Sequence, residues 1–217
     1  MNLQALPEEA LKEILALTEA KTRMDLRDQA QNLFMPFAHH VYDNFIEGRH
    51  HRIIAEKLEQ VARGELKRLI INMPPRHSKS EFASFLMPAW FLGRNPKLKI
   101  IQATHNTELA VRFGRKVRDL IDDPKYKEVF PKTHLKEDNK GAGKWGTSLG
   151  GEYFAAGVGA AVTGRGADLF IIDDPHSEQD ALSETAFDHA YEWYTSGPRQ
   201  RLQPGGAIIV VMTRWGK

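Results

Sequence analysis

The chain has 217 residues, of which 41% are hydrophobic and 27% are charged, with a formal net charge of +2 and no cysteine. This composition is that of a globular protein large enough to bury a sizeable core, and the lack of cysteine excludes disulfides and thiolate metal sites. No apolar run is long enough to cross a membrane, and the acidic first residues do not resemble a signal peptide. We therefore expect no membrane association and a cytoplasmic location.

The first part of the chain predicts helices that precede the main domain. A helical segment opens at Pro7, and an apolar patch follows over Phe34–Phe45, where Pro36 is expected to break it. We interpret residues 1–48 as a small N-terminal helical extension and residues 49–217 as a single catalytic domain.

The first motif is a turn between a predicted strand at Leu69–Asn72 and an amphipathic helix. Lys79 and Ser80 match the end of the phosphate-loop template G-x-x-x-x-G-K-S/T, whereas Met73 and Ser78 stand at its two glycine positions. Such a loop needs backbone N–H groups that cradle phosphate, an ammonium that reaches the terminal phosphates, and a hydroxyl on magnesium. Taken alone, the segment is equally compatible with an ordinary basic turn.

Regular elements are predicted to follow this turn. The helix after it has apolar residues at helical spacing and is expected to kink or end at Pro88. A strand over Lys99–Thr104 and an amphipathic helix over Thr107–Asp122 come next, and residues 124–166 predict hairpins and mobile loops. The inward side of the second helix is predicted to consist of Leu109, Phe113, Val117, Leu120 and Ile121.

The second motif is a pair of acids at the end of an apolar run. Asp173 and Asp174 follow Leu169–Ile172, as expected where a buried parallel strand ends at a ligand site. Nucleoside triphosphate hydrolysis needs one acid near magnesium and another that positions water. We assign Asp173 to the first role and Asp174 to the second, with Glu178 as the alternative water-activating acid. The alternative is a purely structural role, as a core strand followed by an acidic turn.

The third motif closes another strand. After a predicted helix over Ser183–Thr195, the apolar run Ala207–Met212 ends at Thr213 and Arg214. A hydroxyl at the tip of a strand beside a phosphate loop can sense the terminal phosphate, although a core strand with a polar exit gives the same pattern.

The alternation of strands and helices predicts the fold. It indicates an α/β protein built as a three-layer αβα sandwich with a mostly parallel central sheet. Ligands bind at the carboxyl ends of such strands, where Lys79, Asp173 and Thr213 should converge.

Together the motifs resemble the ATPase domain of the large terminase subunit of tailed bacteriophages and prophages. The resemblance rests on RLIINMPPRHSKS, NTELAVRFGRKVRDLI, GVGAAVTGRGADLFIIDDP and VVMTRW in this order. It implies a P-loop NTPase of the ASCE/RecA-like class that uses ATP and Mg²⁺ to translocate double-stranded DNA into a procapsid. In that family the loop commonly lacks one or both glycines and carries an arginine, here Arg76, so the departures at Met73 and Ser78 fit.

The resemblance also implies roles for individual residues. Phosphate would be bound by Pro75, Arg76, His77, Ser78, Lys79 and Ser80, magnesium by Ser80 and Asp173. Arg76 would stabilise the transition state and Thr213 would couple hydrolysis to movement. Arg52 or His51 would touch the base. Arg112, Arg115, Arg118 and Arg165 are candidates for contacts to DNA or to a neighbouring subunit's site, and a solvated basic face is the alternative for each.

The implied partners are double-stranded DNA, a portal ring, a small terminase subunit and further copies of the chain in a working ring, inside an infected or lysogenic bacterial host. The family's C-terminal nuclease should lie beyond residue 217, so we expect no DNA cleavage. Two alternatives stay open, a catalytically silent fragment that binds nucleotide or DNA, and a helicase-type ATPase.

Overall fold

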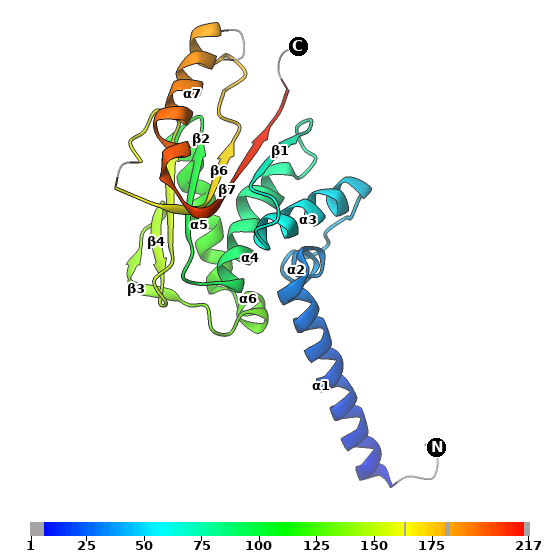
Figure 1. The fold of residues 1–217 in the computed structure, drawn as a ribbon. Helices are drawn as coiled ribbons and strands as arrows, with labels where there is room; N and C mark the ends of the chain where they lie inside the picture. Colours follow the sequence, from blue (N-terminus) through cyan, green and yellow to red (C-terminus); the bar gives the residue numbers. More distant parts are fainter. Residues whose placement is uncertain (1–6, 163, 181–182, 215–217) are drawn as a thin grey trace.

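The computed structural model describes residues 7–162, 164–180 and 183–214. Within these residues the chain forms a mixed α/β fold around a seven-stranded sheet with the order β1-β7-β6-β2-β5-β4-β3 (Figure 1). Five strands are parallel, and β3 and β4 form an antiparallel hairpin at one edge. The strands are β1 Arg68–Asn72, β2 Lys99–Thr104, β3 Leu135–Lys140, β4 Lys144–Thr147, β5 Glu152–Gly157, β6 Ala167–Asp173 and β7 Leu202–Met212.

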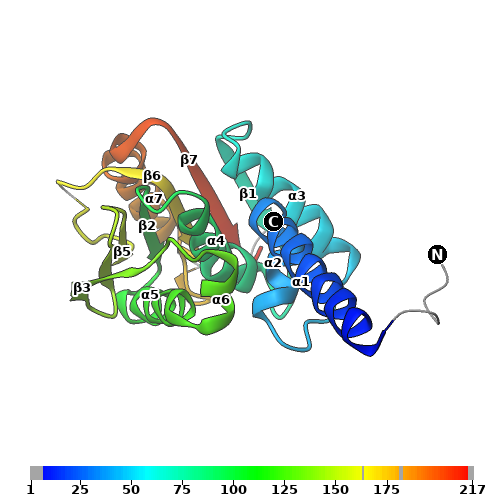
Figure 2. The same cartoon turned by 90° about the horizontal axis from the view of Figure 1, so that it is seen from below.

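Helices cover both faces of the sheet, as predicted. The helices are α1 Glu8–Asn32, α2 Phe34–Val41, α3 Arg49–Ala62, the π-helix η2 Glu81–Leu86, α4 Met87–Arg94, α5 Thr107–Asp122, α6 Pro124–Val129, α7 Glu184–Ser196 and the 3-10 helix η4 Pro198–Arg201. Helices α3, α4 and α5 lie on one face and α7 on the other (Figure 2).

The alternation of side chains along a strand explains why both faces are apolar. In β6, Leu169 and Ile171 belong to the core under α3, α4 and α5, whereas Phe170 and Ile172 belong to the core under α7, where they lie with Trp193. A strand that is buried on both sides therefore reads as a continuous apolar run.

Helix α5 has the predicted bounds, but its buried side is rotated from the predicted one. Val117, Leu120 and Ile121 are buried as predicted, whereas Leu109 and Phe113 are only half-buried. Ala110 and Gly114 are buried instead. The reason is that α5 lies close to the chain at Ala142. A Cβ added at Gly114 would lie 2.7 Å from the Ala142 carbonyl oxygen. Small residues set the contact where the helix lies closest to the sheet.

The prediction that Pro36 breaks its segment is wrong, and of the two outcomes expected at Pro88, a kink or an end, the end is wrong. Pro88 does not end its helix, because α4 continues to Arg94, and Pro36 lies inside α2 instead of breaking it. Proline is tolerated near the start of a helix, where its missing N–H is not needed. Before Pro88 the hydrogen bonding is π-helical, with the Met87 N–H donating to the carbonyl of Phe82. The change of helix type thus occurs where proline would interrupt the bonding in any case.

Helix α6 lies in the region predicted to contain only hairpins and loops. Its start is set by Asp123, whose side chain accepts a hydrogen bond from the Lys125 N–H, and by Pro124 in the first turn. The hairpin prediction for the rest of this region is confirmed by β3 and β4.

Helix α1 projects away from the sheet, and α2 packs against α3 and α4 (Figures 1 and 2). The apolar side chains of Leu11, Ile14 and Leu15 on α1 are exposed, whereas Phe34 and Phe37 of α2 are fully buried in the same core as α4. No helix among the described residues is long and apolar enough to cross a membrane.

Strand β1, which leads into the first motif, lies at the outer edge of the sheet. Its Ile70 side chain is 69% exposed on the α7 face, because α7 covers β6 and not β1. The carboxyl ends of β1, β6 and β7 lie together at the edge near the C-terminus in Figure 1.

Candidate functional site

The turn after β1 has an unusual backbone. Arg76 and Ser78 have φ values of 62° and 61°, in the left-handed region that non-glycine residues rarely adopt. Ser78 stands at the second glycine position of the phosphate-loop template, so the loop keeps a glycine-like conformation without glycine. The backbone N–H groups of Arg76, His77 and Ser78 donate to no group of the described residues. Successive free N–H groups in such a conformation form a concavity suited to an anion.

Lys79 and Ser80 begin the helical segment after this turn. Lys79 is buried, and its Nζ lies 3.2 Å from Asp174 Oδ2. The Ser80 hydroxyl donates to Asp173 Oδ1 at 3.0 Å. The structure thus brings the loop and the two acids of the second motif together across 93 and 95 residues of chain.

Asp173 is the buried acid of the pair, with 2% of its surface exposed. Burial raises the pKa of its carboxyl to about 6, because the charged form loses hydration. The hydroxyls of Ser84 and Ser80 and the Lys79 ammonium lower this pKa, while the Asp174 carboxylate raises it. Asp173 Oδ2 is buried and has no hydrogen-bond partner among the described residues. The Asp173 carboxylate and the Ser80 hydroxyl that donates to its Oδ1 form a donor set that suits Mg²⁺.

Asp174 is held by its backbone as well as by its side chain. Its φ is 42°, its N–H donates to the Val211 carbonyl at 2.7 Å, and its carbonyl accepts from the His105 N–H at 3.1 Å. The Thr213 N–H donates to Asp174 Oδ1 at 2.9 Å. A left-handed aspartate fixed from three sides is a strained conformation of the kind that accumulates at functional sites.

Thr213 is buried at the end of β7, and Arg214 is exposed beyond it. A cavity of about 520 Å³ lies between the ends of β1 and β7. It is lined by Asn72, Met73, Pro74, Pro75, Thr213 and Arg214. Trp215, the last residue of the third motif, lies outside the described residues.

The side chains of Pro75, Arg76 and His77 are exposed on the loop. His77 Nδ1 lies 2.9 Å from the Pro75 carbonyl oxygen, which is an ordinary turn contact. Arg76 forms no ion pair with a described residue, so its guanidinium is available to an incoming anion.

Arg52 and His51 lie in α3, on the other side of the loop. Arg52 is exposed and paired with Glu47, whereas His51 is buried with its ring stacked on Phe82 at 5.0 Å. Burial lowers the pKa of the His51 ring, and the neighbouring His50 and His77 lower it further. His50 and His77 are ring neighbours at 5.8 Å, so α3 borders the loop.

The four candidate arginines do not join this cluster. Arg112 and Arg115 are exposed on α5, and Arg118 bonds to Asp119 on the same helix. The Arg165 guanidinium lies over the Phe154 ring and 3.8 Å from Glu152, at the end of β5 opposite the loop. Thr163, in the same segment, lies outside the described residues.

Glu178, the alternative water-activating acid, is exposed in a turn after the acids. Among the described residues, Glu178 forms no hydrogen bond or ion pair with Lys79, Ser80 or Asp173. Of the two acids considered for activating water, Asp174 is the one that contacts Lys79.

The sequence prediction missed three buried polar residues near Asp173. They are Ser84, Gln102 and Tyr153. Gln102 offered a signal, since a glutamine in the middle of the buried strand Lys99–Thr104 needs a polar partner. Ser84 offered none, because a serine within a helix is common.

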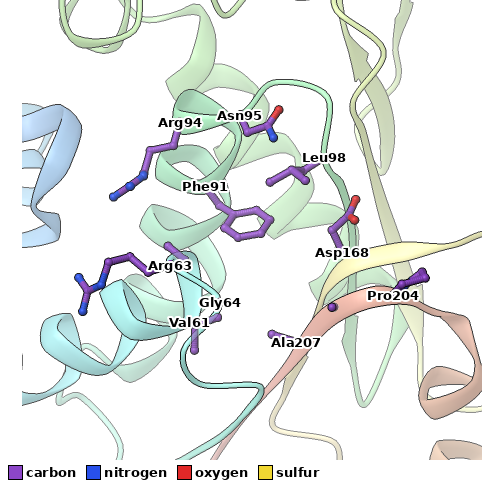
Figure 3. Close-up of a pocket in the computed structure, with 13 residues that line it drawn as sticks. Val61, Arg63, Gly64, Phe91, Arg94, Asn95, Leu98, Asp168, Pro204 and Ala207 are labelled. Atoms are coloured by element: carbon purple, nitrogen blue, oxygen red, sulfur yellow. The ribbon is translucent and has the colours of Figure 1, made fainter.

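A second pocket, of about 410 Å³, lies at the opposite end of the sheet (Figure 3). Asp168 and Phe91 line it, and Arg63 and Arg94 point away from its centre at the rim. Asp168 Oδ2 accepts from the Lys99 N–H at 2.7 Å, which is a structural contact at the start of β2.

Comparisons with known proteins give one named structure. No protein-family model matches the chain, and no curated protein matches it. Among solved structures, the crystal structure of the HK97 bacteriophage large terminase is similar to it, with a TM-score of 0.48 and 14% sequence identity. The alignment covers 77% of this chain and 33% of that one, so this chain spans about a third of that protein's length.

Proposed function

We propose that this chain is a magnesium-dependent ATPase domain of a viral DNA-packaging motor, a P-loop NTPase. The proposal rests on the contact between a glycine-free loop with left-handed backbone and two adjacent acids. In this contact Lys79 bonds to Asp174, and Ser80 bonds to Asp173. The order of motifs and their resemblance to large terminases support the packaging role.

The loop would hold the phosphates of ATP. Free N–H groups at Arg76, His77 and Ser78 would donate to phosphate oxygens, as at other helix N-termini that bind anions. The Lys79 ammonium would leave Asp174 for the terminal phosphates, because a phosphate carries more negative charge than one carboxylate. Arg76 would lie over the transferring phosphate and neutralise the charge that develops there.

Ser80 and Asp173 would hold Mg²⁺ beside the phosphates. A bound magnesium ion would neutralise charge on the phosphate oxygens during transfer. The Asp173 carboxylate would be ionised in this state, and its Oδ1, which accepts from the Ser80 hydroxyl, is the oxygen that supports the assignment.

Asp174 would position the attacking water. Once Lys79 turns to the phosphate, Asp174 Oδ2 is free to accept a proton from water, while the Thr213 N–H keeps Oδ1 in place. Thr213, at the end of β7, would therefore respond to the orientation of the Asp174 carboxylate. This response is the role that we propose for Thr213 in coupling hydrolysis to movement.

The proposed partners follow from the resemblance to large terminases. They are double-stranded DNA, a portal ring, a small terminase subunit and further copies of the chain in a ring, within the cytoplasm of the bacterial host. The exposed Arg112 and Arg115 support contacts to DNA or to a neighbouring subunit, since phosphate contacts need accessible guanidinium groups.

The test is magnesium-dependent release of phosphate from ATP by the purified chain, with and without double-stranded DNA. Asp174→Asn should lower turnover by about 10²- to 10⁴-fold, the range for loss of a general base, with nucleotide still bound. Glu178→Gln is the matched control and should leave turnover unchanged. The reverse pattern would transfer the role to Glu178, and bound ATP without any turnover would favour a nucleotide-holding fragment. Strand separation by the chain would favour a helicase.

A further inference from the structure

A layer of buried polar side chains lies behind Asp173. Ser84 and Gln102 are fully buried, on η2 and β2. Gln102 pairs in register with Ile171, two residues before Asp173, and therefore projects from the same face of the sheet. The floor of the proposed magnesium site is thus polar, although the core around it is apolar.

Tyr153 fixes the orientation of Gln102. Its hydroxyl donates to Gln102 Oε1 at 2.7 Å. The Tyr153 ring stacks on Trp145 at 4.8 Å with an interplanar angle of 3°, and Trp145 Nε1 donates to the Gly114 carbonyl at 3.0 Å. Because the Gln102 carbonyl faces Tyr153, its amide nitrogen points away from Tyr153.

Three buried polar atoms of this layer have no hydrogen-bond partner among the described residues. They are Gln102 Nε2, Ser84 Oγ and Asp173 Oδ2, two donors and one acceptor. Ser84 lies on η2 and Asp173 ends β6, and these two elements pack against each other. The Ser84 hydroxyl and Asp173 Oδ2 form no hydrogen bond with each other, since neither has a partner among the described residues.

Orphaned polar atoms in a protein core are costly, at about 1–3 kcal/mol for each group, so their accumulation beside one carboxylate calls for a functional reason. Ser84 follows Ser80, whose hydroxyl bonds to Asp173, by four residues, about one helical turn, so the two side chains lie on the same side of the helical segment. Groups behind a metal-binding carboxylate commonly orient it, and their loss typically lowers metal affinity by roughly 10- to 100-fold.

We propose that Ser84 and Gln102 are positioning residues that hold the Asp173 carboxylate with Oδ1 toward Ser80, in the orientation that binds a divalent cation. This inference rests on the proposed function, in which Asp173 supports magnesium. Tyr153 acts one step further back, by fixing Gln102.

The test is the affinity for Mn²⁺, measured by electron paramagnetic resonance with a non-hydrolysable ATP analogue present. Ser84→Ala and Ser84→Cys should each raise the Kd for Mn²⁺ by roughly 10- to 100-fold, because cysteine keeps the volume and is a poor donor. The KM for magnesium in ATP hydrolysis should rise accordingly, and nucleotide affinity without metal should not change. Tyr153→Phe should weaken Mn²⁺ binding in the same direction and by less.

Thr133→Val is the matched control, since Thr133 is an equally buried hydroxyl far from the site in the fold. It should lower thermal stability and leave the Kd for Mn²⁺ unchanged. If Ser84→Cys binds Mn²⁺ within twofold of the unaltered protein, the positioning role is wrong while the proposed function stands. If the unaltered protein itself binds no Mn²⁺ with nucleotide, both are wrong.

Discussion

Lys79 Nζ and Asp174 Oδ2 lie 3.2 Å apart, so the turn after β1 and the end of β6 are joined by an ion pair between side chains separated by 95 residues. Lys79 is largely buried in this contact, while about a quarter of the Asp174 side chain is exposed. Lys79 can therefore leave Asp174 for a bound ligand without any opening of the core.

Lys79→Ala should weaken ATP binding by roughly 10- to 100-fold, the loss expected for one charge-assisted hydrogen bond. The affinity is measured by isothermal titration calorimetry in the presence of magnesium. Lys97→Ala, a change to an exposed lysine, is the control and should bind as the unaltered protein does. Equal affinity in both variants would exclude the loop as the phosphate site.

Asp173→Asn should change stability in a pH-dependent way. The pKa of Asp173 is raised from 3.8 to about 6 in the folded protein, so the folded state holds this proton more tightly than the unfolded chain does. The free energy of unfolding therefore falls as pH rises from about 4 to about 6. At pH 7.5 without metal, the variant should be more stable by up to about 3 kcal/mol, and by less at pH 5.

Urea denaturation at both pH values measures this difference. Asp138→Asn, at an exposed acid of β3, should show no such dependence on pH. A stability difference that is the same at pH 5 and pH 7.5 would show that Asp173 does not titrate in this range.

Ser78→Gly should stabilise the protein by up to about 1 kcal/mol. A left-handed backbone costs a non-glycine residue about 1–2 kcal/mol, and the greater freedom of glycine in the unfolded chain offsets part of the gain. Ser148→Gly, at a residue whose φ is not positive, should instead destabilise by about 0.5–1 kcal/mol. Chemical denaturation of both variants gives the comparison, and equal destabilisation would contradict the strain.

Substitutions in the first two helices should have very different effects. Leu15→Ala on α1 should change the free energy of unfolding by less than about 0.5 kcal/mol, since Leu15 is exposed. Phe34→Ala on α2 should cost about 3–5 kcal/mol, because Phe34 is fully buried against Phe82 and Trp90. Thermal denaturation distinguishes the two, and a large effect of Leu15→Ala would mean that α1 is covered in solution.

Most of the sheet could be predicted because its strands are short apolar runs that end in polar residues. The run Leu169–Ile172 shows this well, since its position in the chain and its two acids located the end of β6. Helix α6 was missed because its start signal, Asp123 before Pro124, also favours turns.

The loop and the acids could be predicted because each lies at a strand end, and parallel strands bring such ends together. The layer formed by Ser84, Gln102 and Tyr153 could not, because its members come from three separate elements. Their proximity depends on strand order and on the close packing of α5 at Gly114, and neither leaves a local pattern in the sequence.

Asp174 is also bonded to several separate parts of the fold. Its backbone is bonded to β7 through Val211 and to the residue after β2 through His105, and its carboxylate reaches Thr213 and Lys79. A rotation of the carboxylate would therefore change its bond to the Thr213 amide at the end of β7, whereas the two backbone bonds do not depend on that rotation.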